Sequence, residues 1–99
     1  MHPDLPPTDV EAEYRTRLHT YQVPAHLHEG LVAYFVYHRP PGSFLRAVLE
    51  NDLRHAVQRA DPASLAGLSH VVAFVCDATP AASWGAPASV RTWLAHGVC

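Results

Sequence analysis

The chain has 99 residues, with seven basic side chains, all arginine, nine acidic ones and a formal net charge of −2. This length supports one domain around one core, and the charge balance excludes the basic surface of a general nucleic-acid binder. No apolar run approaches the roughly 18 residues of a membrane span. The N-terminus has no secretory signal, so we expect a reduced cytoplasmic protein in which Cys76 and Cys99 do not form a structural disulfide.

The N-terminal part of the chain predicts a peripheral helix. Residues 1–7 are rich in proline, and we expect them to be flexible. Thr8 and Glu11 have the spacing of a capping box, which predicts a first helix from Thr8 to about His19. Its apolar stripe is thin, so we expect a single helical domain over residues 1–99 whose core spans about 24–96.

A second helix is predicted from Pro24, which suits a first helical turn, to about His38. One face holds mainly large apolar side chains, namely Leu27, Leu31, Tyr34, Phe35 and His38, and a second shoulder holds Val32 and Val36. This helix is therefore either central in the fold or in contact with another chain. Among the histidines, His38 is the one we expect to be buried, neutral and hydrogen-bonded. A strand over 33–37 is the alternative, but the sequence offers no second strand to pair with it.

The segment after Arg39-Pro40-Pro41-Gly42 predicts one long helix from about Ser43 to Ala60. Its apolar stripe comprises Leu45, Val48, Leu49, Leu53, Ala56 and Ala60. On the opposite side Arg46, Glu50 and Arg54 are spaced i, i+4, i+8, as in an exposed ladder of ion pairs.

Asp52 does not fit this amphipathic pattern, because it projects between Val48 and Ala56 inside the apolar stripe. Burial of an unpaired carboxylate costs on the order of several kcal/mol. We therefore expect Asp52 to be a buried structural carboxylate with a partner. It would cap the start of another helix or pair with Arg59 or Arg91; a catalytic or rim position is the alternative.

Asp61-Pro62 predicts the N-cap and first turn of a fourth helix that runs to about Ala78. One of its sides carries Leu65, Leu68, Val72, Val75 and Cys76, and another carries Gly67, Val71, Phe74 and Ala78. We expect Trp84 in the following connector to plug the end of the bundle. A last helix is predicted from Ala86-Pro87 to a C-cap at Gly97. The predicted fold is thus an all-α, compact bundle of about five helices.

No residue pattern indicates catalysis, a metal or a cofactor. A zinc site from His70, Cys76, His96 and Cys99 is disfavoured, because His70 and Cys76 lie six residues apart on different sides of one helix. Cys76 belongs to an apolar stripe, which argues against a nucleophile. We therefore expect no catalytic residue, no metal site and no cofactor.

Several motifs resemble a group of short uncharacterised helical proteins of GC-rich bacteria and their phages and prophages. The resemblance covers about residues 24–96 and rests on Gly42-Ser43-Phe44-Leu45, Ala47-Val48-Leu49, Asn51-Asp52-Leu53, Arg59-Ala60-Asp61, Thr79-Pro80, Ser83-Trp84-Gly85-Ala86-Pro87, Val90 and Trp93-Leu94. The chain departs from the group at Val75-Cys76-Asp77, where similar sequences have an aromatic, Tyr-Asn pattern. The resemblance implies a mobile-element setting, in which small proteins commonly bind a host or defence protein.

Two functions are compatible with these features. The surplus of apolar faces on the second and fourth helices favours a non-enzymatic protein-binding accessory or inhibitory factor, which could form a homodimer. Its candidate interaction surface comprises Arg46, Glu50, Arg54, Val32 and Val36. The alternative is a helix-turn-helix-like regulator that contacts nucleic acid through Arg46, Asn51, Arg54 and Arg59; Glu50 and Asp52 count against it.

Overall fold

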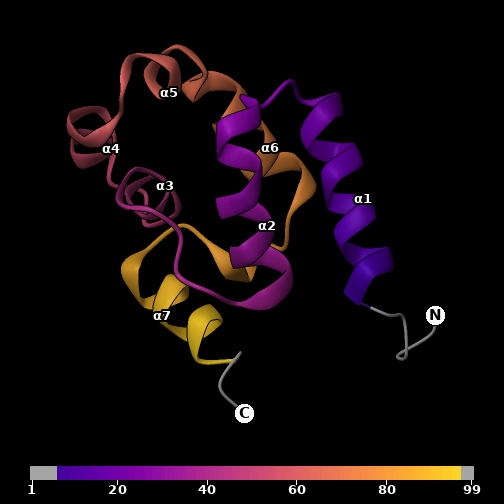
Figure 1. The fold of residues 1–99 in the computed structure, drawn as a ribbon. Coiled ribbons are helices and arrows are strands. Elements are labelled where there is room, and N and C mark those ends of the chain that lie inside the picture. The colour runs from indigo at the N-terminus through magenta and orange to yellow at the C-terminus, as the bar shows by residue number, and fades with distance from the viewer. Residues whose placement is uncertain (1–6, 97–99) are drawn as a thin grey trace.

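The computed structural model describes residues 7–96, and this part of the chain is all-helical, without a strand. The helices are α1 (Pro7–Thr20), α2 (His28–Tyr37), α3 (Ser43–Leu49), α4 (Leu53–Arg59), α5 (Pro62–Ala66), α6 (Leu68–Ala78) and α7 (Pro87–Ala95), with short 3₁₀ turns η1 (Ala25–Leu27) and η2 (Ala81–Ser83). Figure 1 shows α2 between α1 on one side and α3 and α4 on the other. The all-α class is confirmed, with seven α-helices in the described residues in place of about five. None of these helices has the length and apolar character needed to cross a membrane.

The predicted single helix over residues 43–60 is wrong, because the chain turns sharply between α3 and α4. Asn51 adopts a left-handed backbone conformation with φ 63°. The N–H of Asn51 donates to Val48 O and that of Asp52 donates to Ala47 O, which is the pattern of a Schellman C-cap. Asparagine tolerates this conformation better than most residues, and Asp52 then begins α4 as its N-cap.

The predicted helix over residues 62–78 is also divided, at Gly67, into α5 and α6. Its predicted N-cap is confirmed, since Asp61 Oδ1 accepts a 2.7 Å hydrogen bond from the Ser64 N–H. Gly67 is buried against Pro24: a Cβ added at Gly67 would lie 2.3 Å from Pro24 Cγ. The missing side chain therefore lets the α5–α6 junction approach the start of η1.

Helix α1 belongs to the core, which corrects the expectation of a peripheral arm and of a core limited to residues 24–96. Leu18 is fully buried, and Tyr14 stacks on Phe35 with ring centroids 5.8 Å apart. The helix already includes Thr8, so this residue is not the one that precedes it. Residues 1–6 of the proline-rich start lie outside the described residues, as does the predicted C-cap at Gly97.

Helix α2 is central, as the sequence predicts, and it joins the C-terminal elements by hydrogen bonds. The Tyr34 hydroxyl donates to Ser83 O at 2.5 Å, and the Trp93 indole N–H donates to Tyr34 O at 2.7 Å. Burial of the Tyr34 phenol raises its pKa to about 12. At the end of α2, His38 donates from Nδ1 to Trp93 O at 2.7 Å and is half-buried, not fully buried.

Candidate functional site

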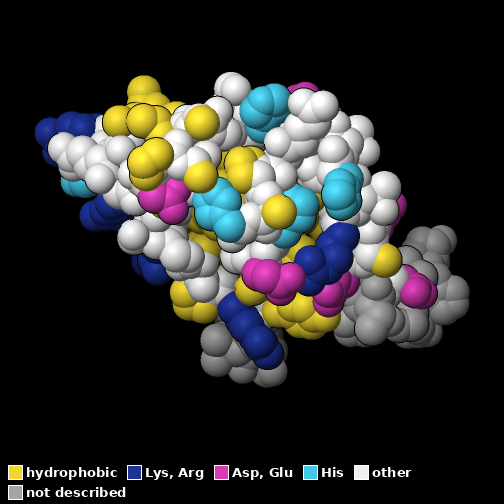
Figure 2. All heavy atoms as spheres, turned by 45° about the horizontal axis from the view of Figure 1, so that its top comes forward, with side chains coloured by type: hydrophobic (Ala, Val, Ile, Leu, Met, Phe, Trp, Pro, Cys, Tyr) yellow, Lys and Arg dark blue, Asp and Glu magenta, His cyan; other side chains and the backbone are white. Residues whose placement is uncertain are grey.

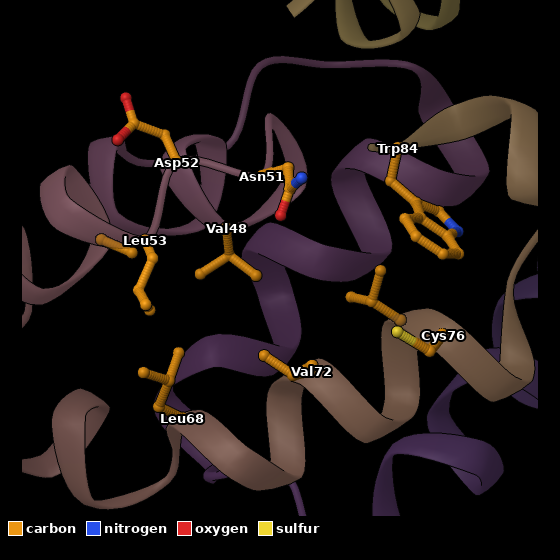
Figure 3. Close-up of a pocket in the computed structure, with 10 residues that line it drawn as sticks. Val48, Asn51, Asp52, Leu53, Leu68, Val72, Cys76 and Trp84 are labelled. Atoms are coloured by element: carbon orange, nitrogen blue, oxygen red, sulfur yellow. The ribbon is translucent and has the colours of Figure 1, made fainter. Parts of the chain in front are cut away.

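An apolar groove of about 110 Å³ lies between the α3–α4 segment and α6. Its lining consists mainly of apolar side chains, with two polar residues from the turn, and comprises Val48, Asn51, Asp52, Leu53, Ala56, Leu68, Val72, Val75, Cys76 and Trp84. Figure 3 shows Val48 and Leu53 extending from the α3–α4 side toward Leu68 and Val72 on the opposite wall. The groove is therefore bounded by segments distant in the sequence and held together by the core beneath it.

Leu53 and Val72 line the groove and remain exposed to solvent, as do two further large apolar side chains, Val57 on α4 and Leu65 on α5. The exposed fractions are 68% for Leu53, 43% for Val57, 46% for Leu65 and 41% for Val72. We call these four residues the apolar rim. In the described part of the chain, Tyr37 is the remaining exposed large hydrophobic residue, and it lies on α2. Exposed large apolar side chains that line a groove are typical of interaction sites.

The α3–α4 turn explains why Leu53 and Val57 belong to this rim. In one continuous helix both would share the core-facing side of Leu45 and Leu49. The left-handed Asn51 changes the direction of the chain, so that Ala56 is the residue of α4 that enters the core. Leu53 is left largely in solvent.

The carboxylate of Asp52 stabilises this turn and is not buried. Its Oδ1 accepts from the His55 backbone N–H at 3.2 Å, and its Oδ2 accepts from His55 Nδ1 at 2.5 Å. These bonds from the His55 side chain and backbone lower the pKa of Asp52. The side chain is 39% exposed, which corrects the expectation of a buried carboxylate. Asp52 does cap a helix, but that helix is α4, and its partner is His55 and not Arg59 or Arg91.

The predicted interaction surface is divided by the fold. Arg46 on α3 and Glu50 at its C-cap form an ion pair, with Arg46 Nε 2.9 Å from Glu50 Oε2. The expected ladder stops there, because Arg54 lies beyond the turn on α4. Val32 is 3% exposed and therefore unavailable to a partner, and Val36 is half-buried. Of these five residues, Glu50 and Arg54 adjoin the groove in sequence, next to Asn51 and Leu53 respectively.

The apolar surplus predicted on the fourth helix is present on α5 and α6. Val71, Phe74 and Val75 enter the core, whereas Leu65 and Val72 face solvent. Sequence reasoning identified this surplus but did not bring Leu53 and Val72 together in one groove. The signal was the pair Asn51-Asp52, in which a residue suited to a left-handed C-cap precedes an N-cap residue.

Cys76 and Trp84 lie at one end of the groove. Cys76 is exposed, although it belongs to the apolar stripe from which the sequence argued against a nucleophile. Trp84 is half-buried against the groove, and its indole N–H is buried without a hydrogen-bond acceptor in the part of the chain described. The disfavoured zinc set included Cys99, which lies outside the described residues. Within residues 7–96, no three His, Cys, Asp or Glu side chains are placed to hold a metal ion.

Several histidine side chains lie close together on the face of the molecule that Figure 2 shows. The His19 and His28 rings are 5.8 Å apart. His28 Nε2 donates to Val23 O at 2.7 Å, and His70 Nδ1 donates to Tyr21 O at 3.2 Å. These bonds anchor the histidines to the loop between α1 and η1, which gives them a structural role.

Comparison of the chain with models of protein families, with curated proteins and with solved structures finds no match in any of the three. The candidate site is accordingly defined by geometry and surface chemistry.

Proposed function

We propose that this protein is a small, non-enzymatic accessory or inhibitory factor that binds another protein through the groove and its apolar rim. The observation that supports this proposal is the exposure of Leu53 and Val72 in the lining of one concave apolar site, with Val57 and Leu65 also exposed on α4 and α5. A domain of this size hides such side chains when no partner requires them, since exposed apolar surface favours aggregation. The resemblance to phage and prophage proteins supports a host or defence protein as the partner, and a cytoplasmic setting belongs to the same proposal.

Affinity capture with matched variants tests this function. The wild-type chain and Leu53→Ser are immobilised separately and exposed to lysate, and each captured protein is purified and titrated against both forms. Because Leu53 is mostly exposed, its replacement leaves the fold intact. Ala88→Ser, at an exposed position on α7, serves as the control. We expect a protein that binds the wild type and the control but not Leu53→Ser; equal binding to all three forms would refute a role for the groove.

The alternative is a helix-turn-helix-like regulator, and the exposed Arg54 and Arg59 on α4 are the observation in its favour. The division of residues 43–60 into two seven-residue helices counts against it, because a recognition helix enters the major groove as one continuous element. Titration of duplex DNA at low and moderate salt decides between the two. Tight binding that falls steeply with salt and is lost in Arg54→Ala would favour the regulator.

A further inference from the structure

A second cavity lies where η1 and the start of α2 meet the N-terminus of α3 and the link between α4 and α5. Its volume of about 310 Å³ reaches the lower end of the roughly 300–1,000 Å³ of pockets for small molecules. Five polar side chains line it, namely His26, Ser43, Arg59, Asp61 and Ser64. The cavity therefore has both the room and the polar groups to hold a small ligand.

The acid in this lining, Asp61, is balanced by its neighbours within the fold. Its Oδ1 accepts from the Ser64 backbone N–H at 2.7 Å and lies 3.8 Å from His26 Nε2. His26 Nε2 also donates to the hydroxyl oxygen of Ser64 at 2.8 Å, and Ser64 is buried. The bonds from the Ser64 backbone and hydroxyl, and then the charge of His26, lower the pKa of Asp61. Arg59 takes no part in this network, although it lies two residues from Asp61 in the sequence.

Two donors in the lining remain free for a ligand. The Arg59 guanidinium is exposed and has no hydrogen-bond or ion-pair partner within residues 7–96. The Ser43 hydroxyl, at the first residue of α3, likewise makes no hydrogen bond to the described part of the chain. A guanidinium binds a carboxylate through two parallel hydrogen bonds, and a hydroxyl of the same cavity can donate a third. These two donors therefore favour an anion, and a planar carboxylate in particular.

The remaining side chains in the lining are apolar. They are those of Leu27, Phe44 and Leu45, and all three belong to the hydrophobic core. Because the core holds them in place, they offer a fixed hydrocarbon surface to a ligand. Inorganic phosphate has no group to place against such a surface, whereas an organic acid has its hydrocarbon body. The lining therefore favours a carboxylic acid with an apolar body over an inorganic anion.

We propose that this cavity binds a small carboxylic acid, with its carboxylate paired with Arg59 and bonded to the Ser43 hydroxyl, and with its hydrocarbon body against Leu27 and Phe44. The site is separate from the apolar groove, because the two linings share no residue. The inference therefore goes beyond the proposed function and does not depend on it.

Benzoate and benzamide test this chemistry, since the two molecules share one ring and differ in charge. Titrations followed by amide NMR spectra measure the affinity and show which residues sense the ligand. We expect benzoate to bind the wild-type protein about tenfold more tightly than benzamide, which corresponds to about 1.4 kcal/mol, and to shift the amide signals of Ser43 and Ser64. Arg59→Gln should remove this preference, and Ser43→Ala should weaken benzoate binding about threefold. Arg54→Gln is the matched control, because Arg54 is also an exposed arginine of α4 but does not line the cavity.

The outcomes judge the pairing with Arg59, the hydrocarbon body and the site separately. Equal binding of benzoate and benzamide, or an equal loss in Arg54→Gln and Arg59→Gln, would overturn the pairing. Inorganic phosphate that binds as tightly as benzoate would overturn the role of the hydrocarbon body, and the absence of any shift at millimolar benzoate would overturn the site. Arg59→Gln and Ser43→Ala replace exposed side chains, so both should melt with the wild type. Leu53→Ser should bind benzoate like the wild type, and the capture experiment judges the proposed function by itself.

Discussion

Asp52 and His55 form a closed unit at the start of α4, in which one carboxylate accepts hydrogen bonds from both the backbone and the ring of the same histidine. The backbone bond satisfies one of the free N–H groups at the helix start. In the ring bond, His55 Nδ1 is the donor, so His55 Nε2 takes no part in this unit. This unit begins α4 immediately after the left-handed Asn51, and the next residue, Leu53, lines the groove.

The first prediction concerns the charge of Asp52. The folded state lowers the pKa of this carboxyl, chiefly through the His55 ring and backbone. Its contribution to stability is therefore complete above the ordinary aspartate pKa and is lost as the pH falls through the folded-state value. Asp52→Ala should lower the melting temperature by several degrees at neutral pH, and this difference from the wild type should shrink in acid.

Asp52→Asn separates the cap from the charge, since asparagine is also a good N-cap. We expect its melting temperature at neutral pH to lie between those of the wild type and Asp52→Ala. Thermal melts of the three forms over a range of pH measure both effects. A difference between wild type and Asp52→Ala that stays constant into acid would show that the carboxylate charge is irrelevant.

The second prediction concerns the place of α1 in the core. Leu18→Ala should cost about 2–5 kcal/mol of unfolding free energy, because it leaves a cavity at a fully buried position. Leu53→Ala makes the same chemical change at a 68% exposed position and should cost about 0.5 kcal/mol or less. Denaturant melts of both variants measure the difference. Similar small losses would mean that α1 is a peripheral arm after all.

The third prediction concerns the buried phenol of Tyr34. Its pKa of about 12 means that the hydroxyl stays protonated and bonded to Ser83 O after an ordinary tyrosine has ionised. A raised pKa of this kind adds stability that is complete below the unfolded-state value near 10 and is lost as the pH rises toward 12. Alkaline titration of tyrosinate absorbance should therefore show a late step from Tyr34, beyond the smaller upward pKa shifts of Tyr14 and Tyr37.

Tyr34→Phe is the variant that assigns this step. It should remove the late tyrosinate signal and, by leaving Ser83 O without its donor, cost about 1–3 kcal/mol. Tyr37→Phe is the comparison, because Tyr37 is on the same helix but exposed, with its hydroxyl donating to Glu11. A late step that persists in Tyr34→Phe would contradict the assignment.

The start or end of a helix was predictable where residues next to it in the sequence cause it. Asp61-Pro62 is a strong local signal, and the predicted helix start is present. The helical pattern around Leu31 and Phe35 is equally local and predicted α2 and its end, although the first predicted turn after Pro24 is the separate 3₁₀ turn η1 and α2 itself begins at His28. The turn at Asn51 was missed because the apolar periodicity continues across it, so a stripe that looks continuous is in fact shared between two helices.

The candidate site was predictable only in part, for a tertiary reason. The two apolar faces of the fourth helix are visible in the sequence, and Val72 does face solvent. The second and the fourth predicted helix each carry a second apolar face, and packing decides which of these faces is buried. Val32 on α2 is buried in the core, whereas Val72 on α6 is exposed. The rim also depends on the α3–α4 turn, since the direction of Leu53 follows from the backbone at Asn51.

The last prediction concerns the contact between Gly67 and Pro24. Gly67→Ala would place a Cβ 2.3 Å from Pro24 Cγ and 2.8 Å from its Cδ, distances that the rigid proline ring cannot accommodate without a shift of η1 or of the α5–α6 junction. We expect a loss of about 1–3 kcal/mol, the usual range for overpacking a core. Gly42→Ala is the matched control, because no heavy atom outside its immediate chain neighbours lies within 4 Å of a Cβ there. It should change stability by less than about 1 kcal/mol, since the poorer N-cap opposes the smaller entropy of the unfolded chain. Denaturant melts of both variants test the contact, and equal stabilities would show that α5 and α6 do not approach Pro24 this closely.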